Sequence, residues 1–385
     1  MTAKVAYLCA DPGIGPDGTK GASVHFRSLA AAFARIGTAL DVTMVRPGDT
    51  SVFAPHECRV VPVRRARGLE GELHQLGHGS VLLDTLAAAG PHAAVYERLS
   101  LFSCAGLAHA RRSGIPFVLE VNAPLWQEAA EFRTLHLHET AKALCMDVVR
   151  GADAVFAVSA PLARQLTVLG ADPKRVHVMG NGADLEAFRS AVPATRPAAL
   201  AGKPLLLFAG SLKPWHGIEF LVRAFGALRK KVDCGLWVVG DGPGRETLER
   251  ASAGLDGAIV CEGAVSHERM PSLLAAADAV LAPYPAAAPE FFSPLKVVEA
   301  LAARRPLVAS RVPCVLGELD GCELPGLHAP DDVDDFVGAV QRVLARPDKA
   351  LPPDVLVARL DWVNKARRIL ASLLPGKAPA EVSVG

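Results

Sequence analysis

The residues that could do chemistry gather in three places, each directly after a run of apolar residues. The first is a glycine-rich segment, DPGIGPDGTKGASVHF at 11–26, which leads into a helix expected to begin near Ala22 or Ser23. Free N–H groups and the positive end of a helix dipole favour an anion, so Gly21 and Ala22 are candidates for a phosphate contact. No Gly-Lys-Ser/Thr follows the segment, so a P-loop is not supported, and a flexible surface turn is the alternative.

The second place is LLLFAGSLKPWHGIEFL at 205–221, where an apolar strand meets Gly210 and Ser211 before a predicted helix. Lys213 and His216 flank the start of that helix. A cation and a hydrogen-bond donor beside free helix amides are suited to holding a diphosphate. Taken alone, His216 is as compatible with a capping or packing residue, but its position in a Trp-His-Gly corner after a buried strand favours a site.

The third place is PEFFSPLKVVEALAARRPLVAS at 289–310, in which a few polar residues interrupt an apolar strand-to-helix region. Ser293 is the expected N-cap, and a proline in the first turn follows it. Lys296 and Glu299 are three residues apart and therefore share a helix face. A lone Lys–Glu pair is usually a surface ion pair, but the apolar Phe-Phe-Ser-Pro-Leu-Lys context favours a site, with Glu290 just before it.

These clusters need elements that place them, and the chain alternates short apolar runs with longer stretches of helical spacing. The predicted strands are Lys4–Leu8, Leu40–Val45, Arg59–Val63, Ala93–Tyr96, Pro116–Val121, Ala154–Val158, Val176–Met179, Leu205–Phe208, Leu236–Val239, Ala258–Cys261, Ala279–Ala282 and Pro306–Ala309. This alternation predicts parallel sheets with helices on both faces. A Pro/Ala-rich stretch at 190–204 divides them, so we expect two doubly wound α/β domains with ligand sites at the carboxyl ends of strands, facing a cleft.

Composition excludes several classes of protein. The chain has 385 residues, 41 Lys plus Arg and 40 Asp plus Glu, for a formal charge of +1. This balance argues against a nucleic-acid-binding protein. The sequence has no apolar run of membrane-spanning length, and its start lacks a signal peptide's apolar region. Eight scattered cysteines without a Cys-x-x-Cys pair fit buried thiols in a reducing compartment, so we expect a cytoplasmic location.

The three clusters, in this order, resemble the retaining glycosyltransferases of family 4, or glycosyl transferases group 1, which have the two-domain GT-B fold. The resemblance extends through VMGNGADLEAF at 178–188, AGSLKPWHG at 209–217, VVGDGPGRETL at 238–248, CEGAVSHERMPSLLAAADAVLAPY at 261–284, FFSPLKVVEALAARRPLVAS at 291–310 and DWVNKARRIL at 361–370. It implies an acceptor-side Rossmann-like domain at 1–190, a donor-side one at 191–355, and a C-terminal helix in 356–385 that crosses back onto the first domain.

The resemblance also implies the reaction. A hexosyltransferase-type enzyme would move a sugar from a UDP- or GDP-sugar to a hydroxyl of a small-molecule, glycan or lipid-linked acceptor, with retention and without cofactor or metal. Glu299 would bind the ribose hydroxyls, the backbone at Ala264 and Val265 the base, and Lys296 and His216 the diphosphate. The other donor-side residues implied are Gly21, Ala22, Gly210, Ser211, Lys213, Gly240, Ser293, Pro294 and Leu295.

Two departures from the family concern the donor side. Members typically carry an arginine and a lysine at the phosphate corner, where this chain has Ser211 and His216. In the family, seven residues lie between the paired glutamates, which places the partner of Glu299 at Phe291, with Glu290 one residue away. We therefore keep Glu290 as a candidate catalytic acid at a shifted position.

A third departure concerns the acceptor side. Many members place a histidine after the strand represented here by PFVLEVNAP, and Asn122 occupies that position, two residues after Glu120. Asn122 is therefore a candidate catalytic residue. Glu120 and Arg98, the latter at the end of the strand in VYERLS, are candidates on the acceptor side.

Other readings remain open. A sugar-nucleotide epimerase of the same fold would need no acceptor, and a non-catalytic nucleotide-sugar-binding protein would need no turnover. Asp332 and Asp334 form a nominal Asp-x-Asp, but a capped helix start explains them better than a metal. The basic cluster of Arg64, Arg65 and Arg67 is either a solvated edge or a contact to an anionic acceptor or a peripheral membrane surface.

Overall fold

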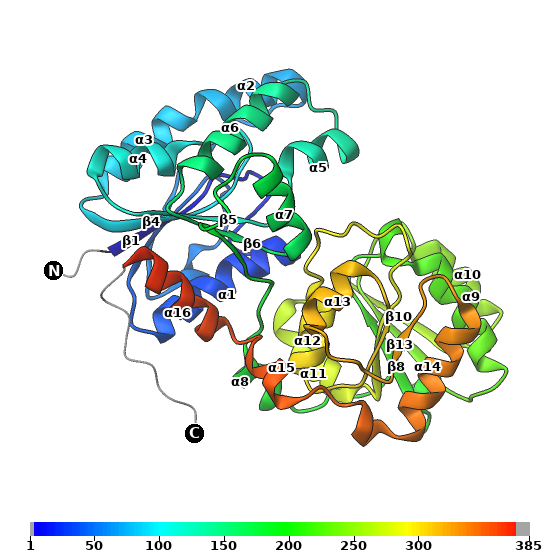
Figure 1. The fold of residues 1–385 in the computed structure, drawn as a ribbon. Helices are drawn as coiled ribbons and strands as arrows, with labels where there is room; N and C mark the ends of the chain where they lie inside the picture. The colour runs from blue at the N-terminus through cyan, green and yellow to red at the C-terminus, as the bar shows by residue number, and fades with distance from the viewer. Residues whose placement is uncertain (1–3, 375–385) are drawn as a thin grey trace. The chain divides into compact units, whose positions relative to one another are not determined.

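The computed structural model describes residues 4–374 and shows two α/β units (Figure 1). One unit holds the chain up to Gly180 together with the segment from Trp362, and the other is Asn181–Asp361. The division lies before residue 190 because the segment after Gly180 packs within the second unit. There the backbone of Ala183 pairs with Asp361, and helix α8 (Leu185–Arg189) contacts α11 and α12.

The first unit contains a seven-stranded parallel sheet in the order β3-β2-β1-β4-β5-β6-β7. The six strands from β3 to β6 in this order follow the doubly wound order 3-2-1-4-5-6. The strands are β1 Lys4–Cys9, β2 Leu40–Met44, β3 Glu57–Val60, β4 His92–Arg98, β5 Phe117–Val121, β6 Ala154–Ala157 and β7 Val176–Val178. The helices are α1 Gly21–Arg35, α2 Gly68–Gly77, α3 Gly79–Ala88, α4 Ala105–Ser113, α5 Leu125–Phe132, α6 His138–Gly151, α7 Ala160–Val168 and α16 Trp362–Leu373.

Helices α1 and α16 lie side by side on one face of this sheet, and α2, α3, α4 and α6 lie on the other (Figure 1). The last helix packs because its apolar residues recur at helical spacing on one face. Trp362, Ala366, Ile369 and Leu373 are all buried in the same core as α1. The expected C-terminal helix returning to the first unit is confirmed; the part of 356–385 after residue 374 lies outside the described residues.

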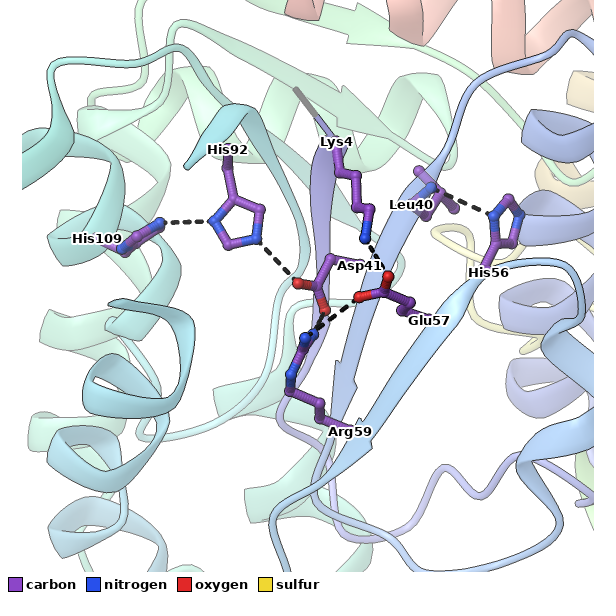
Figure 2. Close-up of polar contacts among 8 residues, drawn as sticks. All are labelled: Lys4, Leu40, Asp41, His56, Glu57, Arg59, His92 and His109. Atoms are coloured by element: carbon purple, nitrogen blue, oxygen red, sulfur yellow. Dashed lines mark hydrogen bonds and ion pairs between the residues drawn. The ribbon is translucent and has the colours of Figure 1, made fainter. Parts of the chain in front are cut away.

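The amino-terminal edge of the first sheet is held by a polar network (Figure 2). Asp41 accepts hydrogen bonds from Arg59 and from His92, whose Nε2 lies 3.2 Å away, and His92 Nδ1 lies 3.0 Å from Nε2 of His109. Burial opposes ionisation, but the His92 hydrogen bond and the Arg59 guanidinium prevail and lower the pKa of Asp41. Parallel α/β sheets bind ligands at the opposite, carboxyl edge, so we interpret this network as structural.

The second unit contains a six-stranded parallel sheet in the order β10-β9-β8-β11-β12-β13, again doubly wound. The strands are β8 Leu205–Ala209, β9 Gly235–Val239, β10 Ile259–Gly263, β11 Ala279–Ala282, β12 Leu307–Ser310 and β13 Leu327–His328. The remaining helices are α9 Ile218–Arg229, α10 Arg245–Ala253, α11 Met270–Ala276, α12 Leu295–Ala302, α13 Pro313–Leu319, α14 Val333–Ala345 and α15 Asp354–Ala358. Two doubly wound domains were expected, and both are confirmed.

Most predicted strands lie within one or two residues of their observed bounds. The strand predicted at Arg59–Val63 is displaced to Glu57–Val60, and β13 was not predicted because two residues carry no detectable period. All eight cysteines fall in the described range and carry free thiols, of which Cys9, Cys145, Cys234 and Cys314 are buried. Among the described residues, no helix combines the length and the apolar character needed to cross a bilayer.

Candidate active site

The second unit carries polar residues at the point where its strand order reverses, between β8 and β11. Gly210 follows β8 directly, and Tyr284 lies just after β11. In open parallel sheets the segments after these two strands diverge and leave a crevice for ligands. The first turn of α12, which contains Lys296, meets the same place, because a Cβ on Gly210 would lie 3.4 Å from the Lys296 ammonium.

The Lys296 side chain is buried without a counter-charge. Its Nζ lies 3.9 Å from the centroid of the Phe208 ring and 5.1 Å from that of Tyr284. It has no hydrogen-bond partner among the described residues. Burial lowers the pKa of Lys296 to about 7. A buried ammonium that lacks a partner is costly, so this position is arranged for an anion that the protein itself does not supply.

His216 lies beside Lys296 but is not a cation. Burial, then the nearby Lys296 charge, lower the pKa of His216 to about 3. The neutral ring donates from Nδ1 to the carbonyl of Ser211 and packs edge-to-face on Tyr284, with centroids 5.8 Å apart. Its Nε2 is then an acceptor. Lys213 is exposed, with its Nζ 4.6 Å from the Trp215 ring centroid, so Lys296 is the buried positive charge of this corner.

Two glycines let the backbone pass closely through this corner. Gly217, which caps α9, has φ +73°, and a Cβ there would lie 1.8 Å from the carbonyl oxygen of Pro283. Gly240, after β9, has φ +136°, and a Cβ there would lie 1.9 Å from the carbonyl oxygen of Gly210. Side chains are therefore excluded at both positions, and Gly240 shapes the Gly210 turn by direct contact.

The segment before α12 is fixed by a residue to which the sequence analysis gave no role. The Asn181 backbone N–H donates to Ser293 Oγ at 2.8 Å, and its Nδ2 donates to the Ser293 carbonyl at 2.7 Å. Ser293 in turn donates to Glu318. The expectation that Ser293 caps α12 is wrong: the N-cap residue is Pro294, which has no side chain able to accept from the helix amides. The Asn-Gly pair at 181–182 was the signal for this contact, which fixes the approach to Leu295.

The carboxylate expected to meet a ribose has a partner of its own. Glu299 is buried in α12, and its Oε1 lies 2.7 Å from Nε2 of His267. His267 follows closely on Ala264 and Val265, the segment expected to meet a base. His267 could not be predicted from the sequence, because no local pattern links two residues on different elements. The contact brings the expected base and ribose contacts together at one end of the sheet.

We expect His267→Ala to weaken nucleotide binding roughly three- to tenfold, because a charged hydrogen bond that orients the Glu299 carboxylate contributes on the order of 1 kcal/mol. His267→Asn, which retains a donor, should recover part of the affinity. Calorimetric titration with UDP and GDP measures the effect. Arg269→Ala, an exposed neighbour paired with Glu262 at 2.7 Å, is the control and should bind as the wild type. Equal affinities for wild type and His267→Ala would contradict a positioning role.

In the first unit, two predicted residues, Arg98 and Asn122, contact the carboxylate of a third, Glu120. Glu120 lies near the carboxyl end of β5 and is directly opposite Arg98, the last residue of β4. Its Oε1 accepts from Arg98 at 2.7 Å and from Asn122, and its Oε2 accepts from Tyr96 at 2.5 Å and lies 2.9 Å from His25 Nε2. Four partners occupy both oxygens, so the carboxylate orients its neighbours.

Charges decide the ionisation of Glu120. Burial favours the protonated form, but the charge and hydrogen bond of His25 and the charge of Arg98 outweigh it and hold the pKa of Glu120 well below its usual range. The His25 ring stacks edge-to-face on Trp362, with centroids 4.6 Å apart, so the returning helix α16 supports the network. The roles of His25, Tyr96 and Trp362 could not be predicted from the sequence, because their contacts join distant segments.

The remaining predicted site residues make fewer side-chain contacts. Gly21 begins α1, the N-cap Lys20 makes no side-chain cap within the described structure, and Arg27 donates to the carbonyls of Pro16 and Gly18 at 2.8 and 2.7 Å. Glu290 is exposed in the turn before Phe291. It therefore lies on the surface of the segment leading to Lys296.

Asp332 and Asp334, the nominal Asp-x-Asp, lie at the start of α14. Asp332 accepts from the backbone N–H of Asp335 at 2.9 Å, so the expected helix cap is confirmed. Within residues 4–374, no three His, Cys, Asp or Glu side chains lie close enough together to hold a metal ion.

Two family models match the chain. The one described as "Glycosyltransferase Family 4" matches residues 19–187, and the one described as "Glycosyl transferases group 1" matches residues 203–346. Alpha-D-kanosaminyltransferase of Streptomyces kanamyceticus is 30% identical over 158 residues, 39% of this chain and 38% of that enzyme. D-inositol 3-phosphate glycosyltransferase of Xylanimonas cellulosilytica is 27% identical over 361 residues, 86% of this chain and 84% of that enzyme.

Solved structures share the arrangement. The crystal structure of Anabaena HepE in complex with UDP has a TM-score of 0.69 to this chain at 17% identity, covering 96% of this chain and 99% of that one. At this identity the likeness establishes the shared fold of two parallel-sheet α/β domains.

Proposed function

The chain belongs to the family 4 glycosyltransferases, glycosyl transferases group 1, and has their GT-B fold; from this premise we propose that its second unit binds a nucleotide sugar and donates the sugar to an acceptor hydroxyl with retention. The observation that carries the proposal is the buried, unpartnered ammonium of Lys296 at the crevice after β8 and β11. A diphosphate supplies the counter-charge that this lysine lacks.

We propose that the base, the ribose and the diphosphate of the donor contact successive groups of residues along the crevice. Glu299, oriented by His267, accepts from the ribose hydroxyls, and the backbone at Ala264 and Val265 meets the base. The diphosphate lies against Lys296 and the first amides of α12, where the helix dipole also favours an anion. Proteins with this fold include HepE, whose crystal structure contains UDP, and we propose a UDP-type donor for this chain.

The reaction needs no protein nucleophile. The bond from the anomeric carbon to the diphosphate oxygen breaks, and the acceptor oxygen forms the new bond on the same face while its proton passes to the departing phosphate. Negative charge grows on that phosphate as the bond lengthens. A fixed ammonium in a water-poor site stabilises this charge more in the transition state than in the ground state. Lys296 therefore promotes the chemical step, and His216, neutral and anchored to Ser211, shapes the site.

We propose that the acceptor binds to the first unit. Arg98 and Asn122 are held by Glu120 at the carboxyl edge of the sheet, where they can meet a polar or anionic acceptor. Relatives of this chain include one enzyme named for inositol 3-phosphate and one named for kanosaminyl transfer, so we propose a hydroxylated small molecule, glycan or lipid-linked acceptor in the cytoplasm.

Product analysis tests the proposal. The full chain is incubated with UDP-glucose, UDP-N-acetylglucosamine and GDP-mannose, each with and without a set of hydroxylated acceptors, and nucleotide release and anomeric proton couplings are measured by NMR. Acceptor-dependent release of the nucleotide with an α-configured product from an α-configured donor is the expected result. An isomerised nucleotide sugar without release would identify an epimerase instead, and tight binding without either product would identify a non-catalytic binding protein.

We expect transfer to continue after removal of divalent metal, because Lys296 and the α12 amides meet the charge of the diphosphate. Activity is measured after dialysis against EDTA, with a magnesium-dependent glycosyltransferase treated in parallel as a control for complete chelation. Loss of turnover that magnesium or manganese restores would contradict this expectation and would place a cation, rather than Lys296, on the leaving group.

A further inference from the structure

Helix α2 of the first unit exposes a stripe of leucines. Leu69, Leu73 and Leu76 follow one another at spacings of four and three residues, which places them on one face of the helix. Their exposed fractions are 44%, 51% and 36%. Scattered exposed leucines are ordinary, but an aligned set on one helix face marks a surface that meets an apolar partner.

The same helix is anchored to the unit on its other face. Glu72 is buried and accepts the backbone N–H groups of His136 and Leu137 at 2.9 and 2.7 Å. His78, after the helix, contacts the carbonyl of Val61 at 2.9 Å. The leucines therefore project from a fixed helix, and Figure 1 shows α2 on the outer side of the helical layer, away from the sheet.

Three arginines border the stripe. Arg64, Arg65 and Arg67 are exposed in the segment that leads into α2. Ala66 of that segment packs on the buried side of the helix, because a Cβ on Gly71 would lie 2.3 Å from its carbonyl oxygen, and Arg67 directly precedes the first residue of α2. The one exposed carboxylate of α2, Glu70, is approached by Arg64 at 3.7 Å and by His74 at 3.8 Å. The surface therefore combines apolar side chains with a positive charge that is partly balanced by one carboxylate.

We propose that this surface, formed by the arginines at 64, 65 and 67 and the leucines of α2, docks the enzyme on an anionic lipid bilayer. Leucines on one helix face insert to the depth of the acyl boundary, and adjacent arginines bind anionic headgroups. Neither feature alone gives stable attachment; the two together do. A second copy of the chain is a poorer occupant, because a symmetric contact would bring two sets of arginines together.

The docking surface is close to the carboxyl edge of the first sheet. Gln75 and His78 line a small cavity together with Ala10, which directly follows β1, and Ser103, which follows β4. A bilayer at this surface would lie near the edge where Arg98 and Glu120 are found. Attachment at this surface does not depend on the proposed donor or reaction.

Co-sedimentation with vesicles tests the proposal. The full chain is mixed with vesicles of phosphatidylcholine alone and of phosphatidylcholine with phosphatidylglycerol, at low and high salt. We expect clear binding to the anionic vesicles, weak binding to the neutral ones, and a loss of binding at 1 M salt, where the Debye length falls to about 3 Å.

Two sets of variants separate the contributions. Leu69→Glu with Leu73→Glu should lower the partition coefficient on anionic vesicles by about tenfold or more, and Arg64→Gln with Arg65→Gln and Arg67→Gln should do the same. Leu351→Glu, at a leucine that is also 44% exposed but lies in the second unit, is the apolar control. Arg111→Gln with Arg112→Gln, two exposed arginines of α4, is the charge control. Both controls should bind within about twofold of the wild type.

Three outcomes would overturn the proposal. The first is equal binding of the wild type to both kinds of vesicle or to neither. The second is undiminished binding of the leucine variant, which would reduce the surface to an anion contact. The third is a concentration-dependent dimer without vesicles that the leucine variant abolishes, which would make a second copy the occupant. Thermal melting by circular dichroism confirms that each variant is folded before it is tested.

Discussion

Replacing Lys296 with alanine is expected to lower the turnover number by roughly a hundredfold or more at saturating donor, the scale of losing one preorganised donor to a developing charge. Its ammonium is buried between the Phe208 and Tyr284 rings with no partner in the described chain. Because the attraction strengthens as the sugar–phosphate bond breaks, the loss falls on turnover more than on the Michaelis constant. Steady-state kinetics with varied donor separates the two.

Lys213→Ala is the matched control for this experiment. Lys213 belongs to the same corner but is exposed over Trp215, where solvent screens its charge. We expect its removal to change turnover by only a few-fold. A Lys296→Ala enzyme with wild-type turnover would show that this lysine does not act on the leaving group.

The lowered pKa of Lys296 predicts how the activity depends on pH. Burial lowers that pKa to about 7 in the empty enzyme, and the charged form is the one that binds a diphosphate. The value of kcat/KM for the donor, which reports groups of the free enzyme, should therefore fall as the pH rises through about 7. This decline should be absent from Lys296→Ala.

Glu120→Gln is expected to lower the free energy of unfolding by about 3–5 kcal/mol, because removing one member of a buried ion pair leaves the other uncompensated. Here the uncompensated charge is Arg98, whose side chain is 9% exposed. Urea denaturation followed by circular dichroism measures the loss.

A neighbouring carboxyl provides the control. Glu97 precedes Arg98 on β4 and is also buried, but burial raises the pKa of Glu97 to about 8. It is therefore neutral at pH 7, and Glu97→Gln replaces one uncharged group by another. We expect it to cost less than about 1 kcal/mol. Equal losses for the two variants would show that the Glu120 charge is not what stabilises this network.

Acid should lower the free energy of unfolding of the wild type more than that of Glu120→Gln. The pKa of Glu120 is lowered in the folded state, against about 4.3 in an unfolded chain. Its contribution is therefore fully present above pH about 4.3 and is lost as the pH falls below that value. The wild type should lose stability relative to Glu120→Gln over this acidic range.

The sequence predicted the elements because their signals are local. Runs such as Leu205–Phe208 and Ala279–Ala282 are short, apolar and bounded by turn residues, and each became a strand. The glycine at 217 could be found in the same way, since the turn before α9 needs a positive φ. β13 has two residues, and no period can be read from two.

The sequence predicted candidate residues for the site but not the contacts that these residues make. Lys296 and Glu299 follow from one helix face, but the partner of Glu299 is His267, 32 residues away, and Glu120 meets His25 across 95 residues. The charge state of His216 could not be predicted either. It depends on burial and on Lys296, both of which arise only when distant segments pack.

The division of the first unit between the two ends of the chain has a consequence for synthesis on the ribosome. The residues up to Gly180 emerge first, yet the core they form includes the apolar face of α16. The whole second unit is synthesised before Trp362. Until then, part of the core of the first unit and the ring of His25 remain exposed. The second unit, continuous in sequence, is under no such delay. The first unit is therefore the first to be synthesised and the last to complete its core. Until α16 is synthesised, the first unit exposes apolar surface that a chaperone can bind.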